Sequence, residues 1–340
     1  MNIITDQKLI KPFNQIASIF STQGVVKSRN ISLLALSLLQ SNIANTYSLA
    51  RGLASLTDQN FNACEKRVNR FLDNKNFVVD DSLFRCHKNL IFSALKEMNL
   101  ISEVIFINVD FTTKKDEFLI LSASIPLKNR GIPLFFTMRN YPKKAGKLNQ
   151  KKMELAFLKS LKHLLPSEYK YVIVADRGFC TSRFINLCLD LGFDYIIRTI
   201  TNLNVILDDK KTNIKNIKEG QYDVAKVLIP TWKMETRLIT NKKEGKIWRL
   251  FTSLKEDNSS IISQYVKRFN IEKMFQDQKS SLFQIESTQI KKYSKFKKLY
   301  YIVTLTQAIM MLIGYLIEEK LPEIKKKYPI HGEILFPLLK

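Results

Sequence analysis

Two apolar runs that each lead into an aspartate constrain the fold of this chain most. The sequence EVIFINVDF occupies residues 103–111, and YVIVADRGF occupies residues 171–179. β-branched and other apolar residues dominate both runs up to the aspartate, as expected of strands that are buried on both faces. Such strands lie in sheets that helices cover, so the sequence predicts an α/β fold class.

The segments around these runs predict a mixed sheet. Two β-rich runs follow the first one, over residues 117–127 and 132–142, and a basic helical stretch spans 147–165. A helix over 181–191 and a strand over 193–200 follow the second run. Three strands, a helix, a strand, a helix and a strand in this order are typical of a mixed α/β core.

The domain boundaries follow from changes in the hydrophobic period. Residues 1–95 carry apolar residues at intervals of three and four and predict an N-terminal helical domain. Residues 96–200 are the first part of the core, and residues 201–255, which alternate short β runs with charged turns, predict a β-rich insertion. Residues 256–320 return to a helical pattern and complete the core, and residues 321–340 form a short C-terminal tail.

The charge of the chain indicates a polyanionic partner. There are 54 Lys and Arg against 31 Asp and Glu, a formal net charge of +23. An AT-rich genome would explain part of the lysine count but not the scarcity of acids. Double-stranded DNA fits this charge, because each phosphate that is neutralised releases condensed counterions. In the N-terminal domain, Arg51, Lys66, Arg67 and Arg70 fit either a helical DNA-binding module or a plain bundle with a solvated basic face.

Other classes of site are excluded by what the sequence lacks. The four cysteines form no CxxC pair and the three histidines are scattered, which argues against zinc and against a disulfide framework. The opening MNIITDQKLI lacks the pattern of a secretory signal, so we expect a cytoplasmic protein. Leu299 to Ile317 is uncharged and long enough to span a bilayer, but its Thr304 and Gln307 favour a helix buried in a soluble protein, with no membrane partner.

Asp110 and Asp176 are the aspartates that end the two apolar runs described above. Ligands in open α/β sheets collect at the carboxyl ends of the strands, so two aspartates there would meet if the strands are neighbours. Hard carboxylate oxygens suit Mg²⁺, and two such ions about 4 Å apart suit displacement at phosphorus. The alternative for each aspartate alone is a strand-end turn or a helix cap.

The segment YVKRFNIEKMFQDQK adds a third acid. Tyr265, Arg268, Glu272 and Lys279 lie within about 60° of one another on a helix, because each residue advances the helix by about 100°. Glu272 would complete a metal site, and the cations and the phenol would grip phosphates. The alternative is a surface helix with an ordinary Arg268–Glu272 pair.

These residues resemble the bacterial DDE transposases of insertion sequence family four. The Y-(2)-R-(3)-E-(6)-K signature of that family is complete at Tyr265, Arg268, Glu272 and Lys279, and the D-R-G-F context of its second acid is found at residues 176–179. The resemblance covers roughly residues 30 to 320, with a β-rich insertion between the second and third acids.

The resemblance implies an RNase H-like catalytic core and a role for each matching residue. Asp110, Asp176 and Glu272 would be the catalytic triad that binds two Mg²⁺ ions, for which Mn²⁺ substitutes. Tyr265, Arg268 and Lys279 would hold phosphates near the transposon end. In some relatives a tryptophan in a W-x-L-x-T-S context stacks on a flipped base, and here IWRLFTSL supplies Trp248, whose alternative is a packed strand aromatic.

The family works by cut and paste on double-stranded DNA. The implied reaction cleaves the terminal inverted repeats of an insertion sequence through a hairpin intermediate and joins them to target DNA. Relatives act as homodimers that pair two ends in a synaptic complex, so the implied location is the bacterial nucleoid. The alternative function is a catalytically inactive, shortened transposase that binds the ends and acts as a repressor.

Overall fold

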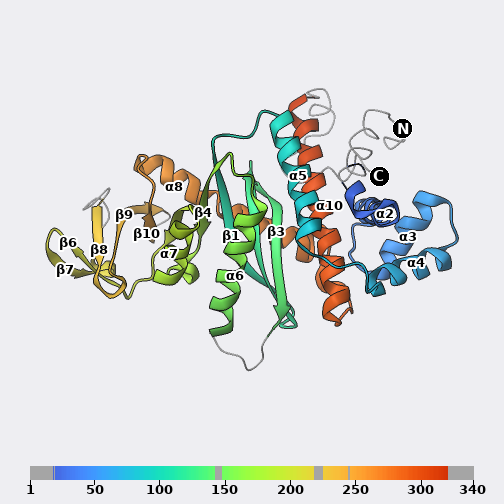
Figure 1. Cartoon of the computed structure of the whole chain (residues 1–340), viewed down its shortest axis with the longest axis horizontal. Helices are drawn as coiled ribbons and strands as arrows, with labels where there is room; N and C mark the ends of the chain where they lie inside the picture. Colours follow the sequence, from blue (N-terminus) through green and yellow to red (C-terminus); the bar gives the residue numbers. More distant parts are fainter. Residues whose placement is uncertain (1–17, 19, 142–147, 218–224, 244–245, 321–340) are drawn as a thin grey trace.

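The computed structural model describes residues 18, 20–141, 148–217, 225–243 and 246–320 (Figure 1). The C-terminal tail that we assigned to residues 321–340 and the start of the N-terminal domain lie outside the described residues. The α-helices are α2 (Val25–Ser41), α3 (Thr46–Thr57), α4 (Phe61–Asp73), α5 (Asp81–Glu97), α6 (Leu148–Leu164), α7 (Ser182–Asp190), α8 (Asn258–Val266), α9 (Phe269–Gln276) and α10 (Tyr293–Lys320).

The described strands join into a single sheet. They are β1 (Val104–Lys114), β2 (Phe118–Leu127), β3 (Arg130–Asn140), β4 (Lys170–Ala175), β5 (Asp194–Arg198), β6 (Asn204–Leu207), β7 (Lys210–Asn213), β8 (Ala225–Ile229), β9 (Met234–Lys243) and β10 (Lys246–Thr252). The order across the sheet is β3-β2-β1-β4-β5-β10-β9-β8-β6-β7. Only β1 with β4 and β4 with β5 pair in parallel, so the predicted mixed α/β class is confirmed.

The β-rich insertion extends the core sheet. Strand β10 pairs antiparallel with β5, so the chain returns from the outer strands to the core before α8 begins. The hairpin of β6 and β7 was not predicted, because its sequence is short and polar. Its turn places Asp208 and Asp209 at φ 49° and 60°, the left-handed conformation that favours a tight hairpin.

Two of the predicted elements end differently in the structure. The strand expected over residues 171–179 stops at Ala175, because Asp176 accepts a hydrogen bond from the backbone N–H of Arg177 and the chain turns into a 3₁₀ helix. The single helix expected around Glu272 is interrupted between Val266 and Phe269, and α9 continues into a π-helix at Asp277–Ser281. Arg268 lies in that interruption.

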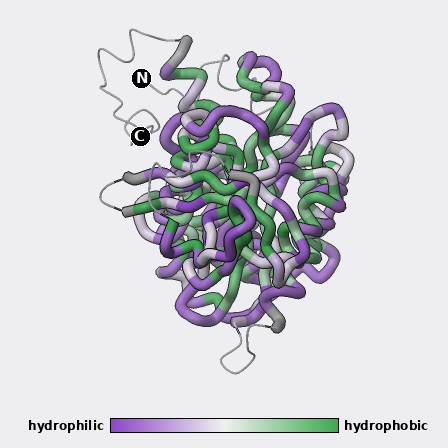
Figure 2. The backbone as a smooth tube through the Cα atoms, turned by 90° about the vertical axis from the view of Figure 1, so that its left-hand side faces the viewer, coloured by the Kyte–Doolittle hydropathy of each residue, from purple (hydrophilic) through white to green (hydrophobic). Residues whose placement is uncertain are grey.

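Helix α10 is the apolar centre of the molecule. It runs beside α5 and packs against β3, α2 and α4 (Figure 1). The Phe118 ring of β2 stacks on Phe296 of α10 at 4.6 Å between centroids. Hydrophobic stretches run through the middle of the backbone tube, whereas the lower outer loops are hydrophilic (Figure 2).

By length and composition, one helix of the described residues, Tyr293–Glu318, would be able to cross a membrane. Its most apolar window is 67% buried inside the protein. The apolar run Leu299–Ile317 therefore contributes most of its surface to the core, as we predicted for a buried helix.

Glu154 of α6 is a buried acid that gives the fold a pH dependence. Burial raises the pKa of its carboxyl to about 7, while Lys151 and Arg139 act in the opposite direction. A folded-state pKa above the unfolded value means that stability falls as pH rises from about 4.5 to about 7 and stays low above that range.

We expect Glu154→Gln to stabilise the protein by about 1–2 kcal/mol at about pH 8 and to change little at about pH 4.5, since the amide removes a buried charge. Thermal unfolding of both proteins at the two pH values measures this difference. An equal effect at both values would contradict the assignment.

Candidate active site

Asp110 and Asp176 occupy the same level of the sheet. The prediction that Asp110 ends its strand is wrong, because β1 continues to Lys114 through its pairing with β2, whereas Asp176 directly follows the end of β4. Val109 of β1 pairs with Ala175 of β4 in the parallel ladder, so Asp110 and Asp176 follow at equivalent positions on neighbouring strands. Side chains at equivalent positions of parallel strands point to the same face. Each carboxylate also accepts a hydrogen bond from the next backbone N–H, at 2.8 Å for Asp110 and 2.6 Å for Asp176.

The junction of α8 and α9 is fixed on that same face. Asn108 lies two residues before Asp110, and its side-chain amide donates to the carbonyl oxygen of Lys267 at 2.9 Å. Asn270 of α9 donates to the carbonyl oxygen of Lys128, between β2 and β3, also at 2.9 Å. These two amides hold the interrupted helix beside Asp110.

Arg268 joins two of the three candidate acids. Its Nη1 lies 3.2 Å from Oδ2 of Asp110, and its Nη2 lies 2.6 Å from Oε1 of Glu272. The Arg268 side chain is only 5% exposed, whereas that of Glu272 is 51% exposed. The guanidinium therefore lies below the surface, with Glu272 at the rim.

The electrostatics of Asp110 reflect this crowding. The pKa of Asp110 is raised to about 6, mainly by burial and in smaller part by the nearby carboxylates Asp176 and Glu272. Arg268 and the N–H of Phe111 oppose the rise. A nearby positive charge would stabilise the ionised form of this carboxyl and lower its pKa.

The three acids fit a divalent cation by type but do not yet share one position. Within the described part of the chain, no three Asp, Glu, His or Cys side chains are close enough together to hold a metal ion. Asp110 and Glu272 instead bind the Arg268 guanidinium. Their oxygens are the hard donors that Mg²⁺ and Mn²⁺ take, so a shared ion requires them to leave Arg268.

Tyr265 and Lys279 take different positions around this cluster. Tyr265 is fully buried, its side chain interacts with Arg268, and burial is the main cause that raises its pKa to about 12. Lys279 lies in the π-helix, and its Nζ is 3.8 Å from Glu286. The predicted single stripe is therefore divided: Tyr265 is buried next to Arg268, whereas Lys279 lies in the π-helix and pairs with Glu286.

Trp248 is a packed strand aromatic in this structure. It is 7% exposed, and its ring lies 5.3 Å from that of Tyr265 and 5.9 Å from that of Phe269. The structure does not bring Trp248 to the surface, where a base would stack on it.

The residues that support the site were not predicted from the sequence. Asn108 shares the face of Asp110 by the two-residue period of a strand, so the pattern N-V-D contained a usable signal. Nothing local marked Asn270. Phe111 and Phe179, which follow Asp110 and Asp176 closely, stack at 5.4 Å with an interplanar angle of 7°, and this contact was also not predicted.

Comparison with known families identifies the class of the chain. The family model described as transposase DDE domain matches residues 134–309, just over half of the chain, from within β3 into α10. The match includes Asp176 and Glu272, whereas Asp110 precedes it. None of the curated proteins compared with the chain matches it. The mixed sheet and its helices agree with the RNase H-like core of such enzymes, and we conclude that this chain belongs to the transposase DDE domain family.

Proposed function

We propose that the chain is a cut-and-paste transposase of the insertion sequence family four type, with Asp110, Asp176 and Glu272 as its metal-binding triad. One observation carries the proposal. Asp110 and Asp176 lie at the same level of two parallel strands, and the Arg268 guanidinium bridges Asp110 to Glu272. The complete Y-R-E-K spacing supports the narrower family.

The bound ions, Mg²⁺ with Mn²⁺ as a substitute, would supply Lewis-acid stabilisation of the attacking and leaving oxygens at phosphorus. Asp110 and Asp176 would hold them from the sheet and Glu272 from α9. Arg268 and Lys279 would align the phosphates of the transposon end. Tyr265 would also contact a phosphate, which would require its buried hydroxyl to become accessible. Base stacking by Trp248 would require its ring to leave its present contacts.

The proposed reaction repeats one displacement at phosphorus in a single site. Water opens a P–O bond at the element's end and frees a 3′-hydroxyl. That hydroxyl would attack a phosphate of the opposite strand, which closes a hairpin and expels the 3′-oxygen of the flanking DNA. A second water would open the hairpin and free the 3′-hydroxyl again, which would then displace a 3′-oxygen of the target DNA. Two copies of the chain would pair two ends, so we propose a homodimer in the synaptic complex that acts on cytoplasmic DNA.

The N-terminal helices are the proposed place of end binding. Arg51 of α3 and Lys66 and Arg70 of α4 are exposed, whereas Arg67 is held by Asn30 at 2.8 Å. Three exposed cations on two adjacent helices support DNA contact by this domain.

The experiment that tests the function uses duplexes that carry the terminal repeats flanking the gene. With Mg²⁺, we expect nicks at the repeat ends and hairpin products that run anomalously on denaturing gels. A host nuclease of RNase H-like fold would instead cut duplexes without the repeats equally well.

A repressor that binds ends without cutting is the second candidate. The observation that favours it is the engagement of Asp110 and Glu272 with Arg268 in place of a shared ion position. Repeat DNA that is bound but never nicked, with either Mg²⁺ or Mn²⁺, would support this candidate.

The raised pKa of Asp110 predicts a pH dependence of ion binding. Because its pKa is about 6, the carboxyl is increasingly protonated below that pH and must lose a proton to bind a cation. We expect the Mn²⁺ affinity to be level above about pH 7 and to fall by up to about tenfold per unit below about pH 6. Calorimetric titration between about pH 5 and 8 measures it, and a flat profile would count against Asp110 as a ligand.

A further inference from the structure

We propose that Arg268 is an exchangeable counter-ion, which neutralises Asp110 and Glu272 until a divalent cation binds them and is then free to pair with a DNA phosphate. This inference rests on the proposed function, because it assumes that these carboxylates receive a cation. It adds a coupling between ion binding and DNA binding through one side chain.

The present contacts of Arg268 hold its guanidinium on two carboxylates. Both terminal nitrogens are engaged, Nη1 with Asp110 and Nη2 with Glu272. The Tyr265 side chain also interacts with this guanidinium, whose central carbon lies 5.8 Å from the centre of the Tyr265 ring and 4.6 Å from that of the Phe269 ring. Because the Arg268 side chain is only 5% exposed and both terminal nitrogens face carboxylates, a phosphate gains a two-point contact with it only if at least one carboxylate is released.

Ion binding and the two ion pairs draw on the same two carboxylates, since Arg268 takes Oδ2 of Asp110 and Oε1 of Glu272. A cation that binds the carboxylates displaces the guanidinium, and by linkage the displaced arginine gains affinity for another anion. Asn108 fixes the carbonyl of Lys267 at 2.9 Å, so the preceding backbone stays on β1. The exchange is therefore a rotation of one long side chain and not a movement of the helix.

Mn²⁺ titration of the whole chain without DNA tests the competition. We expect Arg268→Ala to bind Mn²⁺ about fivefold or more tightly than the wild type, the lower range of ordinary couplings. Arg268→Lys keeps the charge but reaches one carboxylate at a time, so we expect a smaller gain. Lys273→Ala is the matched control, since Lys273 is exposed beside Glu272 and its loss removes the same charge.

The possible results distinguish a failure of the exchange from a failure of the proposed function. Wild-type binding that Asp110→Asn does not reduce would overturn the proposed function. A different result would overturn only the exchange: Mn²⁺ binding by the wild type depends on Asp110, but Arg268→Ala binds Mn²⁺ equally or more weakly. Arg268 would then only position the acids. If Arg268→Ala does not fold, the same comparison with Arg268→Lys decides.

A salt titration tests the release toward DNA. The probe is a duplex without terminal repeats, which the proposed enzyme binds but does not cut. For the wild type, we expect the slope of log affinity against log salt to steepen by about one when Mn²⁺ is present, as for one added phosphate contact. The slope of Arg268→Ala should not change with Mn²⁺, and an equal change in both proteins would contradict the exchange.

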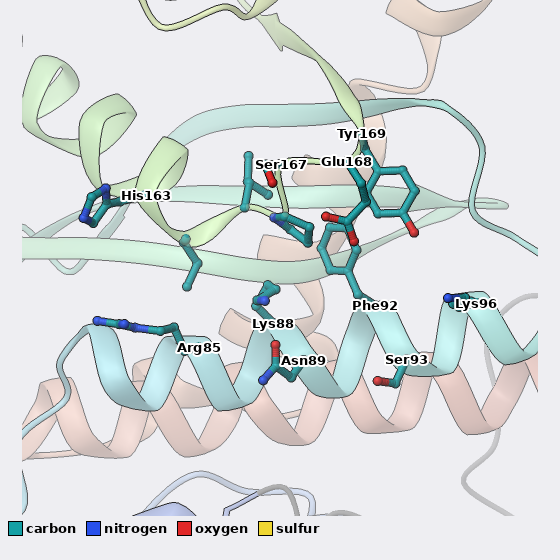
Figure 3. Close-up of a pocket in the computed structure, with 13 residues that line it drawn as sticks. Arg85, Lys88, Asn89, Phe92, Ser93, Lys96, His163, Ser167, Glu168 and Tyr169 are labelled. Carbon is teal, nitrogen blue, oxygen red and sulfur yellow. The ribbon is translucent and has the colours of Figure 1, made fainter.

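A separate cavity carries a second inference. It has a volume of about 520 Å³ and lies between α5 and the turn at residues 166–169 (Figure 3). Arg85, Lys88 and Lys96 line it from one face of α5, with Phe92 between them and Glu168 opposite. Among the described residues, none of these three cations forms an ion pair within 4.0 Å, although the Glu168 carboxylate attracts Lys88. A polar hollow with three cations and one carboxylate keeps a net positive charge, which suits phosphate groups.

The cavity is remote from the carboxylates. It borders the start of β4 at Lys170, whereas Asp176 follows the end of that strand at Ala175. Six extended residues separate the two ends by roughly 20 Å. We infer that the cavity binds backbone phosphates of duplex DNA away from the reacting phosphate.

Salt dependence measures this contact directly. The triple variant Arg85→Ala, Lys88→Ala, Lys96→Ala should lower the salt slope of duplex binding by about 2–3, one for each phosphate lost. The control removes the same charge from the far end of the sheet, through Lys210→Ala, Lys211→Ala and Lys215→Ala. Equal slopes in the triple variant and the wild type, or equal losses in both triples, would overturn the inference, whereas a wild type that binds no DNA would overturn the proposed function itself.

Discussion

We expect Asp110→Asn, Asp176→Asn and Glu272→Gln each to abolish cleavage at the terminal repeats and to leave DNA binding intact. An amide is nearly isosteric with the carboxyl but carries no charge, so it is a poor ligand for a hard cation. The ions supply several kcal/mol of transition-state stabilisation, so the rate of nicking should fall by about 10³-fold or more in each variant. Single-turnover cleavage of a labelled repeat duplex, with binding measured in parallel, gives both quantities.

The matched control for these variants is Asp190→Asn, an exposed aspartate at the end of α7. It makes the same chemical change outside the carboxylate cluster and should cleave at the wild-type rate. Nicking within about tenfold of the wild type in any one of the three triad variants would remove that residue from the triad.

Leu305→Ala has the second large effect, on stability. Leu305 is fully buried in α10, where the helix meets the sheet and the N-terminal helices. Removing a buried leucine side chain leaves a cavity and costs about 2–5 kcal/mol. We expect the free energy of unfolding, measured by urea denaturation, to fall by that amount.

The control is Leu316→Ala, the same change at a half-buried position of the same helix. It should cost clearly less, because less apolar surface returns to water. Equal and small losses in the two variants would show that α10 is not the core helix described above.

The strong local periods explain which elements the sequence predicted. The buried strands β1 and β4 follow from their apolar runs, and the aspartates that close these runs were found for the same reason, although β1 continues past Asp110 to Lys114. The 3.6-residue period likewise predicted α6, α7 and the long apolar α10. These features depend on residues close together in the chain.

Features that depend on distant partners were not predictable in this way. The interruption around Arg268 forms where the carbonyl of Lys267 meets Asn108, 159 residues earlier in the chain. The same holds for the bridge from Arg268 to Asp110 and for the burial of Trp248 against Tyr265 and Phe269. A helical wheel places Tyr265, Arg268 and Lys279 on one stripe, but tertiary contacts decide which of them faces solvent.

Anomalous scattering from Mn²⁺, in crystals of the chain bound to a terminal-repeat duplex, would locate the ions. We expect two peaks about 4 Å apart, within ligand distance of Asp110, Asp176 and Glu272, with Arg268 turned toward a phosphate. Peaks that lie elsewhere, or a guanidinium still bound to both Asp110 and Glu272 with no ion beside them, would contradict it.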